Sequence, residues 1–216
     1  MDTNWLIDGI IWYLSLVVLL TFHELAHAWA AWLCGDDTSR LQGRFSLNPL
    51  AHIDPIGTVL MPWLMILLPQ MFGQFLIGWA KPVIFNPARL RNRWRDEMII
   101  AMAGPAMNIV LAILFVALAR VGLIFNWPEA VGLFGFVAKL SLRLCFFNLI
   151  PIPPLDGSHV MRNLSGMSYE TYWRLSQWGF IGIVIVLQIP IVRQVLGFVT
   201  DTTLAIIGAC FGFPSQ

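Results

Sequence analysis

Three ionisable residues lie close together inside the first long apolar stretch of the sequence. They are His23, Glu24 and His27, in the pattern His-Glu-x-x-His. Residues four apart share one face of a helix, so both imidazoles can reach a single metal ion. Two histidines are typical zinc ligands, and an adjacent glutamate can take a proton from a metal-activated water. The motif therefore indicates a catalytic zinc site on a helix.

A catalytic zinc needs a third protein ligand and an open position for water. Asp156 is the best candidate, because it follows the apolar run 144–155 in a segment whose prolines prevent a regular helix. Gly157 permits a tight turn there, and broken backbone at membrane depth is tolerated where it lines a cavity or is buried. Most other acidic residues are interpreted as solvated charges in loops or at helix ends: Asp36, Asp37, Asp54, Asp96, Glu97, Glu129 and Glu170.

The same polar residues allow a different interpretation. Intramembrane histidines and glutamates also form hydrogen-bonded clusters that join helices, or line ion paths in transporters. A non-catalytic membrane protein is therefore the competing hypothesis.

The composition shows what surrounds these residues. Of 216 residues, 58% are hydrophobic and 12% are charged, about half of the ~25% charged residues usual in soluble domains. Fifteen Phe and ten Trp argue against disorder, and a net charge of +1 gives no field for nucleic acid. Three widely spaced cysteines indicate neither a disulfide framework nor a cysteine zinc site. The chain is predicted to be a membrane protein with no nucleic-acid partner.

Long apolar stretches predict the helices, since a span needs roughly 20 apolar residues. The fold class is predicted as an all-α polytopic membrane protein with about five to six transmembrane or re-entrant segments and an intramembrane zinc site. Residues 1–216 are expected to form a single integral-membrane domain, with a catalytic core at about 9–157 and C-terminal helices at about 175–213. The predicted segments are 9–33, 55–80, 98–119, 131–152 (which contains Lys139 and Arg143), 175–192 and, if Asp201 is tolerated near an interface, 195–213.

The basic residues of short loops set the expected orientation. Clusters at 81–95 and 40–44 both favour the cytoplasmic side, yet a simple crossing by 55–80 would separate them. Prolines and glycines within 55–80 would break a regular helix, so a re-entrant loop is an equal alternative to a span.

The two motifs together resemble the paired signature of the site-2 protease family of intramembrane zinc metalloproteases. The second motif is Asn148-x-x-Pro-x-Pro-x-x-Asp156-Gly157, and the segment 103–108 is similar to the family's G-P-x-x-N element. The stretches 47–55 and 78–87 resemble the compact prokaryotic branch without PDZ or CBS domains.

The resemblance implies roles for particular residues. His23, His27 and Asp156 would ligate one catalytic Zn²⁺, Glu24 would be general base and acid, and Asn148 would contact the substrate backbone or the developing oxyanion. Helix packing is expected of Gly104 and Asn108. His52 is expected to have a structural or channel role, and His159 to be a solvated or backbone-bonded histidine.

The predicted function is hydrolysis of peptide bonds in or near transmembrane segments of membrane-protein substrates, as in regulated intramembrane proteolysis. The expected partners are a substrate helix and the lipid bilayer, and the expected location is a prokaryotic inner membrane, with the site open to the cytoplasm. The alternatives are a metal or ion transporter, or an inactive relative that binds single-span partners. A prenyl-protein-processing zincin is disfavoured, because its further ligand is normally a glutamate and the partner segment here offers Asp156.

Overall fold

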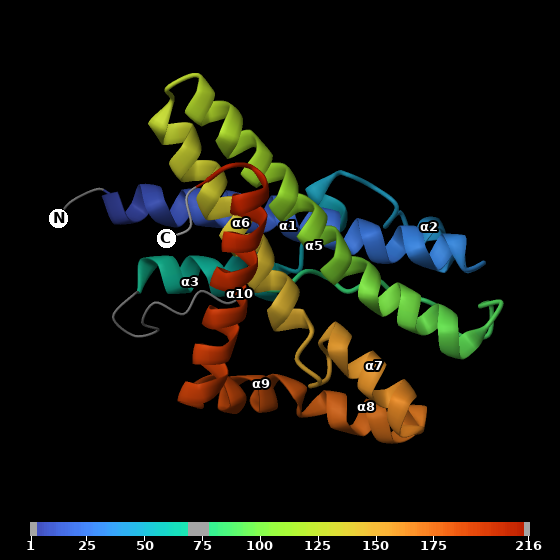
Figure 1. The fold of residues 1–216 in the computed structure, drawn as a ribbon. Helices are drawn as coiled ribbons and strands as arrows, with labels where there is room; N and C mark the ends of the chain where they lie inside the picture. The colour runs from blue at the N-terminus through green and yellow to red at the C-terminus, as the bar shows by residue number, and fades with distance from the viewer. Residues whose placement is uncertain (1–3, 69–77, 214–216) are drawn as a thin grey trace. The chain divides into compact units, whose positions relative to one another are not determined.

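The structure is a computed structural model that describes residues 4–68 and 78–213 (Figure 1). The described residues are largely helical and contain no strand, which confirms the all-α prediction. Among them, four helices are long and apolar enough to cross a membrane. The chain divides into two compact units, Met1–Arg91 and Asn92–Gln216. The prediction of one domain over 1–216 is not tested by this division and stays a prediction.

The first unit is built around α1, Asn4–Leu33, which contains the predicted stretch 9–33 and starts earlier. Its 30 residues span ~45 Å, more than the ~30 Å of a hydrocarbon core. The helix ends at the following glycine, Gly35, whose φ of 103° suits a residue without a side chain. A short helix, α2 (Thr38–Leu41), follows.

The rest of this unit consists of short helices and an irregular segment. After the 3₁₀ turn η1 (Pro49–Ala51), a π-helical turn η2 (Pro55–Leu60) continues into α3 (Met61–Leu67). Asp54 caps this run, because its carboxylate accepts hydrogen bonds from the backbone N–H groups of the first turn. Residues 78–91 contain no helix or strand, and backbone bonds tie them to the loops beside α1.

The predicted segment 55–80 is only partly described. Its helical portion, Pro55–Leu67, has 13 residues and spans ~20 Å, too short to cross a bilayer by itself. Residues 69–77 lie outside the described residues. The choice between a span and a re-entrant loop therefore stays open.

The second unit begins with a helical hairpin of α5 (Arg93–Ile124) and α6 (Pro128–Asn148). These helices contain the predicted stretch 98–119 and most of 131–152. The last four residues of the latter are not helical, because α6 ends at Asn148. The segment 149–155 that follows contains three prolines and is called the Pro-rich turn here. The hairpin is seen in Figure 1 as the green and yellow helices.

Four further helices follow the Pro-rich turn. They are α7 (Asp156–Ser165), α8 (Tyr169–Gln177), α9 (Gly179–Gln188) and α10 (Pro190–Cys210). The prediction of a single helix over 175–192 is wrong, because this stretch is divided among α8, α9 and α10. Proline cannot continue a helix, and Ile189 before Pro190 has the extended backbone that a following proline favours. A side chain on Gly179 would also collide with the backbone of the Pro-rich turn.

The C-terminal helix carries Asp201, which was expected near an interface. Asp201 is the twelfth residue of the 21-residue helix α10, and Lys139 is the twelfth of the 21-residue helix α6. The two side chains form an ion pair with an N–O distance of 2.7 Å. A charge at the middle of a span is costly unless it is paired, so this contact explains how both helices tolerate one.

Removing one member of this pair is expected to destabilise the protein more than removing both. Lys139→Met leaves Asp201 unpaired, and we expect the free energy of unfolding to fall by about 2 kcal/mol. Lys139→Met combined with Asp201→Leu should recover most of that loss. A double-mutant cycle of unfolding in lipid nanodiscs measures the coupling. A single variant as stable as the parent would contradict the role of the pair.

Candidate active site

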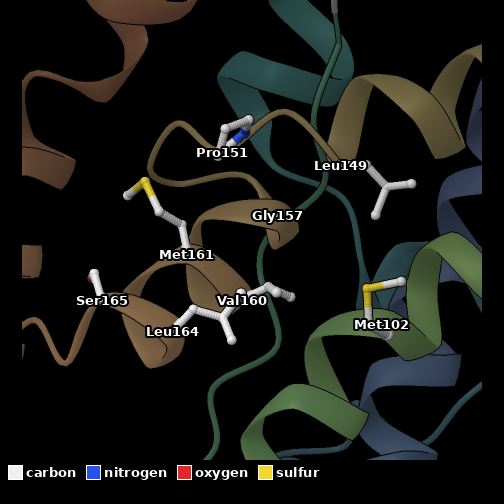
Figure 2. Close-up of a pocket in the computed structure, with 8 residues that line it drawn as sticks. All are labelled: Met102, Leu149, Pro151, Gly157, Val160, Met161, Leu164 and Ser165. Carbon is white, nitrogen blue, oxygen red and sulfur yellow. The ribbon is translucent and has the colours of Figure 1, made fainter.

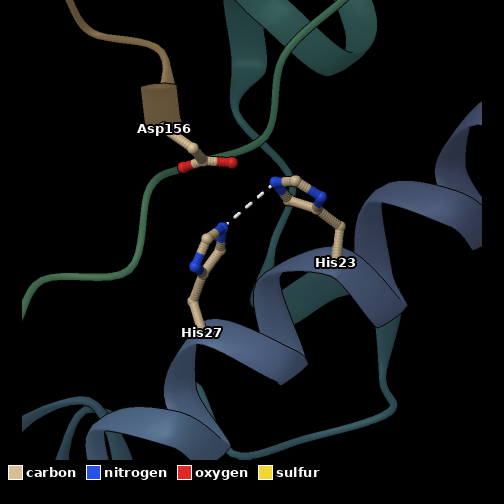
Figure 3. A group of neighbouring side chains, drawn as sticks. All are labelled: His23, His27 and Asp156. Atoms are coloured by element: carbon tan, nitrogen blue, oxygen red, sulfur yellow. Dashed lines mark hydrogen bonds between the residues drawn. The ribbon is translucent and has the colours of Figure 1, made fainter. Parts of the chain in front are cut away.

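His23 and His27 lie on successive turns of α1 with their rings facing each other (Figure 3). Both are buried, with 3% and 7% of their surface exposed. Their Nε2 atoms are 3.1 Å apart, and the rings meet edge to face with centroids 4.7 Å apart. The prediction that both imidazoles share one helical face is therefore confirmed.

The geometry of this pair fits a zinc ion. Two nitrogens that each bind a tetrahedral zinc at ~2.05 Å lie about 3.3 Å apart, which is close to the observed 3.1 Å. At such a separation the two nitrogens can share a proton or ligate one metal ion. Buried imidazoles in this arrangement are donors of the type and spacing that zinc takes.

Glu24, between the two histidines in sequence, is buried with 8% of its surface exposed. Its Oε2 accepts a hydrogen bond of 3.1 Å from the backbone N–H of Val83. The irregular segment 78–91 therefore holds one carboxylate oxygen in place. A carboxylate fixed by its surroundings is a suitable proton acceptor, because little reorganisation is needed when it reacts.

Asp156 belongs to the second unit, where it is the first residue of α7 (Figure 3). The Pro-rich turn before it is closed by backbone bonds from Ile152 to Ile150 and from Leu155 to Ile152. The positive end of the helix dipole stabilises a carboxylate at this position. Asp156 is half-buried and offers carboxylate oxygens, which zinc also accepts.

Gly157 allows the turn and α7 to pack closely. A Cβ at this position would lie 2.2 Å from the carbonyl oxygen of Leu149 and 3.0 Å from that of Ile150. Gly157 was expected to permit a tight turn, and the structure shows that it is needed for close approach. Its φ is not in the left-handed region, so conformational freedom is not the reason.

An apolar groove runs along α7 (Figure 2). Its volume is about 560 Å³, and its walls come from α5, the Pro-rich turn and α7. Met102, Leu149, Val160 and Leu164 line it together with Gly157. Gly157, the residue after Asp156, therefore borders this apolar groove.

The two asparagines of the motifs are used differently. Asn148 is the last residue of α6, and its Nδ2 donates a 2.9 Å hydrogen bond to the carbonyl oxygen of Leu144 on the same helix. Asn108 on α5 is fully buried, and its backbone carbonyl accepts a 2.7 Å bond from the hydroxyl of Ser141 on α6. The close packing expected at Asn108 agrees with this contact between the helices of the hairpin.

The remaining two histidines are held by the protein. His52 is 2% exposed, and its Nε2 lies 2.8 Å from the carbonyl oxygen of Ser46, so its ring closes the loop between α2 and η1. His159 was expected to be solvated or bonded to backbone. Instead its Nδ1 lies 3.3 Å from a carboxylate oxygen of Glu97, and its Nε2 lies 3.0 Å from the hydroxyl of Tyr172.

Three carboxylates that were interpreted as solvated are buried. Asp36 and Glu97 are fully buried, and Asp96 is 7% exposed. Asp36 accepts bonds from the backbone of Thr38 and Asn86, and therefore joins the end of α1 to the segment 78–91. Local sequence gave no sign of the bond between Asp36 and Asn86, because the two residues are 50 positions apart.

Adding one methyl group at Gly157 is expected to disturb Asp156. Gly157→Ala should push α7 away from the turn, because the new Cβ overlaps the backbone of Leu149. We expect a loss of about 2 kcal/mol in unfolding free energy and at least tenfold weaker zinc binding, measured by competition with a chelator. Gly135→Ala is the matched control, since a Cβ there meets nothing within 4 Å. Unchanged zinc binding in a folded Gly157→Ala protein would refute this prediction.

Comparisons with known proteins identify the family of this chain. The family model described as Peptidase family M50 matches residues 11–132 and 124–187. The provisionally named zinc metalloprotease YwhC of Bacillus subtilis (strain 168) is 34% identical over 191 residues, which cover 85% of this chain and 82% of that protein. Rip2 of Mycolicibacterium smegmatis, named in the same provisional way, is 31% identical over 191 residues, or 85% of this chain and 67% of that protein.

A shorter match is found with Rip2 of Mycobacterium tuberculosis (strain H37Rv), at 33% identity over 143 residues. It covers 65% of this chain and 52% of that protein. No solved structure matches the chain. The family match covers both motifs and most of the helices that carry them. The chain therefore belongs to peptidase family M50, the site-2 proteases, and is a membrane-embedded zinc metalloprotease.

Proposed function

We propose that this protease cleaves a peptide bond in or near a transmembrane segment of its substrate, with one Zn²⁺ held by His23, His27 and Asp156. Glu24 is the general base and then the general acid. The observation that carries this proposal is the buried pair of imidazole nitrogens, 3.1 Å apart, on a helix of membrane-spanning length.

The proposed chemistry divides between the metal and the chain. Bound zinc would polarise the scissile carbonyl and acidify the attacking water. Glu24 accepts the proton of that water and transfers it to the leaving amine. The backbone N–H of Val83 keeps the carboxylate oriented through both transfers. General acid–base catalysis of this kind contributes typically ~10²–10⁴-fold to the rate.

The substrate must present an accessible peptide bond. Backbone groups of a membrane helix are already hydrogen-bonded, so the substrate has to unwind locally before it can react. Asn148 binds the exposed backbone or the oxyanion in this proposal, and its amide has to exchange its bond to Leu144 to do so. The apolar groove beside Gly157 supports a substrate with apolar side chains, as transmembrane segments have.

The proposed location is the cell membrane of a prokaryote, with the site open to the cytoplasm. The basic residues of 81–95 and 40–44 support this orientation through the positive-inside rule. Segment 78–91, which carries much of this charge, also bonds to Glu24 through Val83. A basic segment attached to the active-site glutamate favours a site near the cytoplasmic surface.

Glu24→Gln tests the chemistry separately from metal binding. The variant keeps a side chain of the same shape but cannot accept the proton, so we expect cleavage of a single-span reporter protein to fall by at least 10²-fold. Bound zinc, measured by elemental analysis of the purified protein, should stay near the level of the parent. A Glu24→Gln protein that cleaves as fast as the parent would overturn the proposal.

Ligand variants complete this experiment. His27→Ala and Asp156→Ala should each lose zinc and activity together, because neither leaves three protein ligands. His52→Gln is the control, since its side-chain amide can keep the bond to Ser46 while an imidazole is removed. Zinc binding that survives Asp156→Ala would remove Asp156 from the ligand set without excluding a protease.

A further inference from the structure

The carboxylate of Glu97 lies on the first turns of α5 and is completely buried. Side chains from two other helices surround it. Arg162 on α7 forms an ion pair with it, the hydroxyl of Tyr169 on α8 donates a 2.6 Å hydrogen bond, and Nδ1 of His159 on α7 lies 3.3 Å away. Glu97 therefore joins three helices of the second unit through one carboxylate.

Further contacts close this group into a network. The hydroxyl of Tyr172 lies 3.0 Å from Nε2 of His159 and 3.0 Å from the hydroxyl of Ser158. The guanidinium of Arg162 stacks over the ring of Tyr169 at 3.8 Å. We name the side chains of these six residues the polar clasp: Glu97, Ser158, His159, Arg162, Tyr169 and Tyr172.

The protonation of the tyrosines suits this arrangement. Burial and the hydrogen bond to Glu97 raise the pKa of Tyr169, and burial raises the pKa of Tyr172. Both hydroxyls therefore keep their protons at physiological pH and can donate to the partners that the structure gives them. Glu97 therefore accepts hydrogen bonds from a neutral donor, Tyr169, and from a cationic donor, Arg162.

The polar clasp stabilises helix α7, which is too short to be stable in isolation. Helix α7 has 10 residues, and isolated helices shorter than ~12–15 residues are marginal even with favourable sequences. The close packing of Gly157 on the Pro-rich turn holds only the beginning of this helix, so further contacts are needed along the rest of it. Three contacts set its position against α5 and α8, and they are made by Ser158, His159 and Arg162. All three lie within two turns of Asp156, the first residue of the helix.

A purely stabilising role does not require charges here. Replacing a buried ion pair with apolar residues of similar size is often neutral or stabilising, whereas the directional bonds of an ion pair fix geometry. Glu97 accepts from donors that approach from different helices, which determines where α7 lies. An apolar cluster would keep the helices together without fixing that position.

We propose that Glu97 is a positioning residue that sets the place of the zinc ligand Asp156 through Arg162 and His159. This inference rests on the proposed function, because it takes Asp156 as a ligand. The chemistry at Glu97 itself involves no substrate and no metal. Its effect is on how tightly zinc is held and on the geometry at which it is held.

Glu97→Gln is the first test, made on the full-length protein in lipid nanodiscs. We expect zinc affinity, measured with a competing chelator, to fall by about 10–100-fold, the usual effect of removing a residue that orients a metal ligand. Cleavage should recover at saturating zinc to within about tenfold of the parent. Tyr169→Phe removes one hydrogen bond only and should shift zinc affinity in the same direction by a smaller factor, in a protein that folds.

Two controls separate positioning from stability. Asp201→Asn breaks an ion pair between α6 and α10, and it should lower the unfolding temperature without changing zinc affinity. The double variant Glu97→Leu with Arg162→Met should unfold at a temperature near that of the parent while zinc stays weakly bound. If the role of Glu97 were structural alone, this double variant would regain both the unfolding temperature and the zinc affinity of the parent.

The outcomes decide between the possible roles. Folded Glu97→Gln and Tyr169→Phe proteins that both bind zinc within twofold of the parent would overturn the inference, provided Asp156→Ala loses zinc. If Asp156→Ala keeps zinc, the ligand set of the proposed function fails instead. An equal loss of zinc in Asp201→Asn would also overturn the inference, since it would trace the effect to general instability.

Discussion

The organisation of this protein follows from one constraint, which is that an ionisable group in an apolar helix needs a partner. In a chain with 12% charged residues, several charges inside helices are paired, and they are paired in different ways. Lys139 and Asp201 neutralise each other between two spans, and Glu97 is neutralised by Arg162. His23 and His27 meet each other at a distance that suits a shared cation. The same electrostatic requirement therefore produces helix pairing, helix positioning and a metal site.

The helices could be predicted where the apolar stretch was long and uninterrupted. The stretch 9–33 became α1, which starts five residues earlier, and 98–119 became α5, which is longer at both ends. Pro105 inside α5 does not end that helix. The prediction of one helix over 175–192 failed, because hydropathy does not detect the two residues at which the helix is broken. Gly179 is needed for contact with a distant turn, and Pro190 starts a new helix. Long-range packing against residue 153 cannot be read from a local window.

The site could be predicted where its residues lie on one regular element. Four-residue spacing on a helix places His23 and His27 together whatever surrounds them, and the structure agrees. Glu97 could not be found in this way, because its partners lie 62 to 72 residues further along the chain on two separate helices. A carboxylate about one turn from the basic start of a helix looks like a solvated charge. Only the folded arrangement of α7 and α8 covers it.

The close approach of Gly179 to the Pro-rich turn has a consequence for recognising working members of such a family. A Cβ at this position would lie 1.8 Å from the carbonyl oxygen of Pro153, so even alanine forces the turn to move. A chain could therefore retain every residue of the two motifs and still lack the native backbone path of the turn between Asn148 and Asp156. A glycine at position 179 therefore helps to distinguish an active family member from an inactive one, which the metal-binding residues by themselves do not.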